Sequence, residues 1–138
     1  MDPVVTGKER AAPRVRALGV AGAVLAAAAV WTVAVLAGAD LLVSFGPGQP
    51  ELSVTLPWVI MVSLLSALAG WALLSLLERV TPRAMTVWTV AAVTVAALSL
   101  AGPLSSTAPV GTKASLIAMH LAVAGALILA LRRTRRGM

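Results

Sequence analysis

The stretch PWVIMVSLLSALAGWALLSLL, residues 57–77, decides the fold because it contains no charged side chain. A helix that crosses a bilayer needs about 20 predominantly apolar residues, and this stretch has that length. Pro57 suits the first turn of a helix, where its missing N–H group costs little. We therefore expect residues 57–77 to cross a membrane.

The rest of the chain has the same character. Three further stretches are apolar over a comparable length, namely residues 17–39, 84–101 and 114–131. Of the 138 residues, 59% are hydrophobic and 12% charged, whereas soluble domains have roughly 45–50% and about 25%. A soluble core of this size cannot bury so much apolar side chain, so the sequence predicts an integral membrane protein.

Short connections between the spans predict their arrangement. Residues 78–83 join the second and third spans, and residues 102–113 join the third and fourth, with Gly102-Pro103 indicating the end of the third helix. Consecutive helices are then antiparallel neighbours. The sequence predicts an all-α, up-down-up-down four-helix bundle at residues 17–131, between basic tails at residues 1–16 and 132–138.

The basic residues predict how the bundle is oriented. Ten of the eleven lie before the first span, between the second and third, or after the fourth, and only Lys113 lies on the other side. The positive-inside rule makes the arginine-rich side cytoplasmic. We expect a multi-pass protein of the cell membrane, with both termini in the cytoplasm.

Residues Ala37-Gly38-Ala39 have the small side chains of a signal-peptidase site. The apolar stretch before them is longer than the roughly 7–15 residues of a signal peptide's hydrophobic region. We therefore expect the first span to remain in place, and the orientation of the other three does not depend on it.

His120, the only histidine, lies inside the fourth span, and ionisable groups inside a membrane usually face the bundle interior. Counting from Ala114 places it roughly 9 Å below the outer edge. Asp40 reaches a matching depth if the first helix continues to Phe45. Three arrangements stay open: a hydrogen-bonded pair with Asp40, a neutral imidazole bonded to a hydroxyl such as that of Ser63 or Ser99, and a contact elsewhere, for example with lipid.

Other polar side chains in the spans have simpler interpretations. We expect the serine and threonine hydroxyls to bond mainly to carbonyls of their own helix. Trp58 fits a membrane interface, and the remaining tryptophans fit packing positions. Glu78 is expected to be a solvated or loosely paired charge. The C-terminal arginines are candidate contacts for anionic lipid: Arg132, Arg133, Arg135 and Arg136.

No motif for common soluble chemistry is present. There is no phosphate-binding Gly-rich loop, no His-Glu-x-x-His and no Gly-x-Ser-x-Gly. One histidine without cysteine does not make a standard zinc site. We therefore expect no enzymatic activity, no metal and no cofactor. The net charge of +6 is explained by membrane topology, so we expect a lipid bilayer and no nucleic acid as partner, with a homo-oligomer or a second membrane protein left open.

The second half of the chain resembles a known family. Its features are Gly-Trp followed by leucines and Glu-Arg in the second span, Trp-Thr in the third, Ser-Leu-Ala-Gly-Pro at the end of the third, and Met-His in the fourth. These resemble uncharacterised four-span membrane proteins of high-GC Gram-positive bacteria. The resemblance implies the architecture and no catalytic residue.

The leading interpretation is a small, non-enzymatic structural or accessory component of the cell envelope. The alternative is a small transporter or channel component that uses Asp40 and His120 as a protonatable pair. The absence of a clear internal repeat and the apolar midplane of the spans speak against transport.

Overall fold

The computed structural model describes residues 8–136, most of which are helical. The helices are α1 (Lys8–Leu36), α2 (Leu56–Val80), α3 (Ala84–Ser99), α4 (Ala101–Ser105) and α5 (Val110–Arg136). Four segments are long and apolar enough to cross a membrane: Pro13–Leu36, Leu56–Val80, Ala84–Ser105 and Val110–Arg133. The prediction of an all-α fold with four membrane-spanning helices is confirmed.

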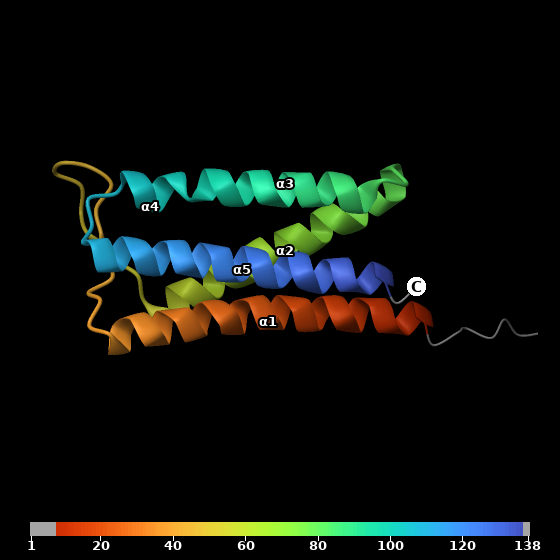
Figure 1. Ribbon diagram of the computed structural model, residues 1–138, viewed down its shortest axis with the longest axis horizontal. Helices are drawn as coiled ribbons and strands as arrows, with labels where there is room; N and C mark the ends of the chain where they lie inside the picture. Colours follow the sequence, from red (N-terminus) through yellow and green to blue (C-terminus); the bar gives the residue numbers. More distant parts are fainter. Residues whose placement is uncertain (1–7, 137–138) are drawn as a thin grey trace, which may run out of the picture.

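Figure 1 shows α1, α5 and α3 side by side, with α2 crossing behind them at an angle. α1 packs most extensively against α5 and then against α2. The start of α1 and the end of α5 lie at one end of the bundle (Figure 1). Because Arg16 of α1 contacts Glu78 of α2 there, we call it the arginine end.

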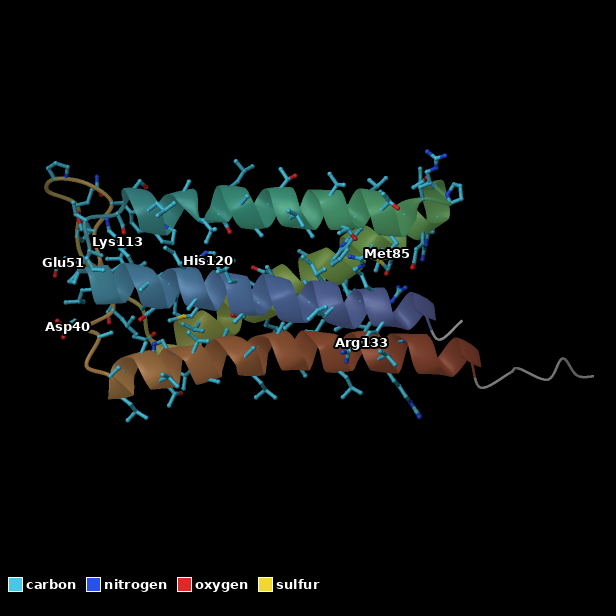
Figure 2. All side chains as sticks on the ribbon, in the orientation of Figure 1. Asp40, Glu51, Met85, Lys113, His120 and Arg133 are labelled. Carbon is cyan, nitrogen blue, oxygen red and sulfur yellow. The ribbon has the colours of Figure 1, made fainter. Side chains whose placement is uncertain are left out.

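We call the opposite end the hairpin end. Two strands that the sequence did not predict, β1 (Leu42–Val43) and β2 (Leu52–Ser53), pair antiparallel there. The Thr107 N–H donates to the Ser44 carbonyl at 3.0 Å, which joins this hairpin to the α4–α5 connection. Figure 2 shows Asp40, Glu51 and Lys113 at this end. The α1–α2 connection and the short α4–α5 connection are therefore joined at this end of the bundle.

The first helix is shorter at its hairpin end than predicted, because glycine ends it. Gly38 has a φ of 83°, a left-handed conformation that glycine adopts without strain. Its N–H donates to the Val35 carbonyl, and the Ala39 N–H donates to the Ala34 carbonyl, both at 3.0 Å. This is a Schellman motif. The helix ends at Leu36, so the continuation to Phe45 that Asp40 would need to reach the depth of His120 does not occur.

At its other end, α1 begins at Lys8, within the segment that was predicted to be a tail. α5 likewise continues to Arg136. Residues 1–7 and 137–138 of the predicted tails lie outside the described residues.

The third span does not end at Gly102-Pro103, as the sequence suggested. α3 ends at Ser99, and the short α4 then carries Gly102 and Pro103 to Ser105. Proline lacks the N–H that would bond the carbonyl four residues earlier and its ring clashes with that carbonyl. For Pro103 this carbonyl belongs to Ser99. The proline therefore breaks the helix one turn before itself and leaves a second helical segment in line with the first.

The indole N–H groups of two tryptophans donate hydrogen bonds to the backbone of neighbouring segments. The Trp88 Nε1–H donates to the Gly70 carbonyl at 2.8 Å and joins α3 to α2. The Trp31 Nε1–H donates to the Val54 carbonyl at 2.7 Å and joins α1 to the segment after β2. Trp71 packs against the cluster of buried residues that contains Trp88. The prediction that these three rings are packing anchors is confirmed.

Candidate functional site

A cavity of about 740 Å³ lies between α2, α3 and α5. α2 and α3 are joined at the arginine end and diverge toward the hairpin end (Figure 1). Exposed residues on both helices line the opening, for example Leu73 on α2 and Val95 on α3. Since both helices are membrane-spanning segments, the cavity opens sideways between them.

The lining of the cavity is almost entirely apolar. Among the described residues that line it, the polar side chains other than indole rings are Ser63, Ser66, Ser99 and His120. Trp88 closes the arginine-end part and is only 1% exposed. The hydrogen bond from its indole to Gly70 keeps α2 and α3 together at this point. Sites that bind small molecules have this composition and a volume of about 300–1,000 Å³.

His120 is half-buried on α5 and lines this cavity. Its Nδ1 lies 2.7 Å from the Leu116 carbonyl oxygen. A carbonyl only accepts hydrogen bonds, so Nδ1 carries the hydrogen and a neutral ring leaves Nε2 as an acceptor. Nε2 has no hydrogen-bond partner in the part of the chain that the structure describes. Because α5 begins at Val110 and not at Ala114, the ring lies about 15 Å along the helix from its first residue.

The structure does not bring Asp40 to His120. Asp40 follows the Schellman motif and lies exposed on the connection to β1. It borders a different hollow, which Trp31 and Thr55 also line. Figure 2 shows its carboxylate at the hairpin end, outside the bundle, and His120 along α5. The matched depth proposed for the pair was wrong because the helix ends before Asp40.

The serine hydroxyls divide into two groups. Those of Ser75 and Ser99 donate to the carbonyls of Trp71 and Ala96 of their own helices, at 3.0 and 2.7 Å, as predicted. Ser63, which is 7% exposed, and Ser66, which is exposed, differ from these, because both line the cavity and neither makes a hydrogen bond with any described residue. Neither Ser63 nor Ser99 bonds to His120.

Comparison with known protein families shows which family the chain belongs to. Residues 7–137 match the family of unknown function DUF6069. The chain belongs to this family. No curated protein and no solved structure matches it.

Membership of DUF6069 agrees with the resemblance seen in the sequence, because both concern uncharacterised proteins and the four apolar helices fit a four-span family. The match covers nearly the whole chain, whereas the sequence motifs covered its second half. The bacterial group stays a prediction, and the family assigns no activity to the cavity.

At the arginine end, this member of DUF6069 contains an ion pair that sequence reasoning missed. The Arg16 guanidinium donates to both Glu78 carboxylate oxygens, at 2.6 and 3.1 Å. Arg16 is 9% exposed, and its Nε is buried without a hydrogen-bond partner. Glu78 was expected to be solvated or loosely paired; its side chain is 39% exposed, but both of its oxygens are paired with Arg16.

A signal for this pair was present in the sequence. Arg16 lies on the same face of α1 as Val20, Ala23 and Ala27, at helical spacings of three and four residues, and these three are buried. Arg16 therefore follows the buried face into the arginine end. The predicted C-terminal lipid contacts differ, because Arg132 and Arg133 are exposed. The side chains of Arg135 and Arg136 lie outside the described part of the structure.

Proposed function

We propose that this protein is a non-enzymatic accessory component of the cell membrane that holds a lipid-like molecule by its apolar chain. The cavity between α2, α3 and α5 carries the proposal, because it is apolar, about 740 Å³ in volume and open between two membrane-spanning helices. An apolar gap between helices in a bilayer is open to lipid chains and unfavourable for water. The occupant therefore comes from the surrounding lipid.

The arginine distribution supports the orientation in this proposal. Arg16, Arg79, Arg83, Arg132 and Arg133 belong to the arginine end, whereas Lys113 belongs to the hairpin end. By the positive-inside rule the arginine end faces the cytoplasm, which places both termini inside and the hairpin outside. Exposed arginines at that end contact anionic lipid headgroups.

The alternative, a small transporter, was based on a pair of Asp40 and His120 that the structure does not contain. A protonatable pair required Asp40 beside His120, and Asp40 lies on an exposed connection instead. The apolar lining of the cavity suits the chain of an amphiphile and offers few groups to an ion.

Tryptophan quenching tests the proposal. In a variant with Trp88 as the only tryptophan (Trp31, Trp58 and Trp71 to Phe), we expect phosphatidylcholine with brominated chains to quench the fluorescence of the reconstituted protein. Trp88 is 1% exposed and closes the cavity, so a chain in the cavity brings bromine to the ring.

Two neighbouring alanines supply the matched control. Ala96 lines the cavity, whereas Ala97 is exposed and does not. In the single-tryptophan background, Ala96→Leu fills part of the cavity and should reduce the quenching, while Ala97→Leu should leave it unchanged. Equal quenching in both variants would mean that Trp88 senses only the surrounding bilayer, and the proposal would fail.

A further inference from the structure

The polar groups of the cavity are not spread along it. Ser63, Ser66, Ser99 and His120 all lie toward the hairpin end of their helices, each between the middle and that end. From Val123 to Ile128 on α5, and around Trp88 on α3, the lining is apolar. An amphiphile fits this division in one direction only, with its head near His120 and its chain pointing toward Trp88.

Three polar groups of the lining, other than indole rings, have no hydrogen-bond partner among the described residues, namely the Nε2 of His120 and the hydroxyls of Ser63 and Ser66. Ser66 is exposed, so the two less exposed groups, on His120 and Ser63, define the hydrogen bonds that the head group must make. When the imidazole of His120 is neutral, its Nε2 accepts a hydrogen bond, since Nδ1–H donates to the Leu116 carbonyl at 2.7 Å. The Ser63 hydroxyl, 7% exposed and without a partner among the described residues, both donates and accepts. A hydroxyl group matches both, because its hydrogen is donated to Nε2 and its oxygen accepts from Ser63.

The lack of charged side chains in the described part of the cavity lining restricts the chemical class of the head group further. No Lys, Arg, Asp or Glu lines the cavity among residues 13–133, whose side chains the structure describes. An ionised head would lose its hydration without gaining an opposite charge, which is costly in an apolar environment. A neutral head with one hydrogen-bond donor does not have this cost.

We infer that the cavity selects a neutral, hydroxyl-headed amphiphile, with its hydroxyl held between His120 and Ser63 and its chain directed toward Trp88. This inference rests on the proposed function and adds the head group and the direction of the bound molecule. With the hairpin end outside, the head lies in the outer half of the bilayer.

A competition experiment with matched chains tests the inference. Octadecanol, methyl octadecyl ether and octadecane are added to bilayers that contain brominated lipid, and recovery of Trp88 fluorescence is followed in the single-tryptophan protein. Only the alcohol donates a hydrogen bond. We expect it to displace the brominated chain at a mole fraction about fivefold to tenfold below that of the ether, after correction for partitioning.

Substitutions of His120 and Ser63 test whether these residues cause the preference for the alcohol over the ether. His120→Phe removes the acceptor and should make the alcohol and the ether equally effective, while octadecane still displaces the brominated chain. Ser63→Ala should reduce the preference for the alcohol severalfold. His120→Gln supplies an amide oxygen as acceptor and should restore part of the preference, which a purely structural role of His120 would not do. Each variant is first checked for unchanged helical circular dichroism and a monodisperse elution profile.

The outcomes separate the inference from the proposed function. If the alcohol and the ether displace the brominated chain equally well from the unsubstituted cavity, the inference is wrong although a chain is bound. If His120→Phe and Ser63→Ala keep the full preference for the alcohol, the assigned residues are wrong. If no competitor restores the fluorescence of Trp88, chain binding itself is refuted.

Discussion

The two ends of the bundle are packed in different ways. At the arginine end, Leu74 and Leu131 are fully buried, and Trp88 is nearly so. A Cβ atom added to Gly19 of α1 would lie 2.6 Å from the Ala130 Cβ of α5, so these two helices approach one another closely here. At the hairpin end, α2 and α3 diverge and the same helices enclose a cavity. The hairpin end also has buried apolar residues, among them Leu41, Val59 and Met119, so the two ends differ in the space between α2 and α3 and not in whether they hold the bundle together.

Polar groups have different roles at the two ends of the bundle: at one end they pair with one another, and at the other they line the cavity. Arg16 and Glu78 form an ion pair that links α1 to α2. Ser63 and His120 each present a hydrogen-bonding atom without a described partner to the cavity. Substitutions at the arginine end should therefore reduce stability, whereas substitutions at the cavity should change binding.

Glu78→Ala should have the largest effect on stability. It leaves the Arg16 guanidinium, 9% exposed, without its carboxylate. Breaking a buried pair costs about 3–5 kcal/mol. We expect about 2 kcal/mol here, since the Glu78 side chain is 39% exposed and water screens part of the interaction. The free energy of unfolding is measured by titrating the detergent-solubilised protein with dodecyl sulfate.

Glu51→Ala is the matched control for this prediction. Glu51 is an exposed carboxylate at the hairpin end, with no ion pair to any described residue. Its replacement should leave the unfolding curve unchanged. An equal loss in both variants would show that net charge matters and that the pair with Arg16 does not.

Gly19→Ala should have the next largest effect. The new methyl group would meet the Ala130 Cβ at 2.6 Å, so α1 and α5 must separate. Overpacking of this kind costs about 1–3 kcal/mol. Gly22→Ala on the same helix meets nothing within 4 Å and should be neutral or stabilising by up to about 1 kcal/mol, because alanine favours helix over glycine. Similar losses in both variants, measured in the same titration, would argue against a close α1–α5 contact.

Ser63→Ala should have the smallest effect on stability. Its hydroxyl bonds to no described residue, so removal breaks no bond within the fold and should change the free energy of unfolding by less than about 0.5 kcal/mol. Ser75→Ala, at the arginine end, removes the bond to the Trp71 carbonyl and the acceptor of a 3.5 Å bond from Arg16, and should cost more, about 1 kcal/mol. A large loss on replacing Ser63 would show that its hydroxyl has a structural role and would weaken its assignment to a ligand.

Much of the fold was predictable because it depends on local sequence. Uncharged stretches of membrane-spanning length gave four helices, and each lies close to its expected position. Helix ends were less predictable. Gly38 ended the first helix before Asp40 through a motif of two backbone hydrogen bonds, and Pro103 broke the third span one turn before itself.

The sequence identified several residues of the candidate site but not the contacts that they make. His120, Ser63 and Ser99 stand out in the sequence because they are polar residues in apolar spans, and all three line the cavity. Their relationships were not visible. The imidazole bonds to Leu116 and Ser99 to Ala96, each within its own helix, while Asp40 faces away from them.

From the amino-acid sequence alone follow the membrane environment, the number of spans and the expected orientation, because hydrophobic length and charge act on each segment separately. The packing of the helices decided the rest. Where α1, α2 and α5 meet closely, Arg16 reaches Glu78, and where α2 leaves α3, the cavity with His120 and Ser63 opens. Such relationships depend on crossing angles and on contacts between distant segments, which no single segment of the chain encodes.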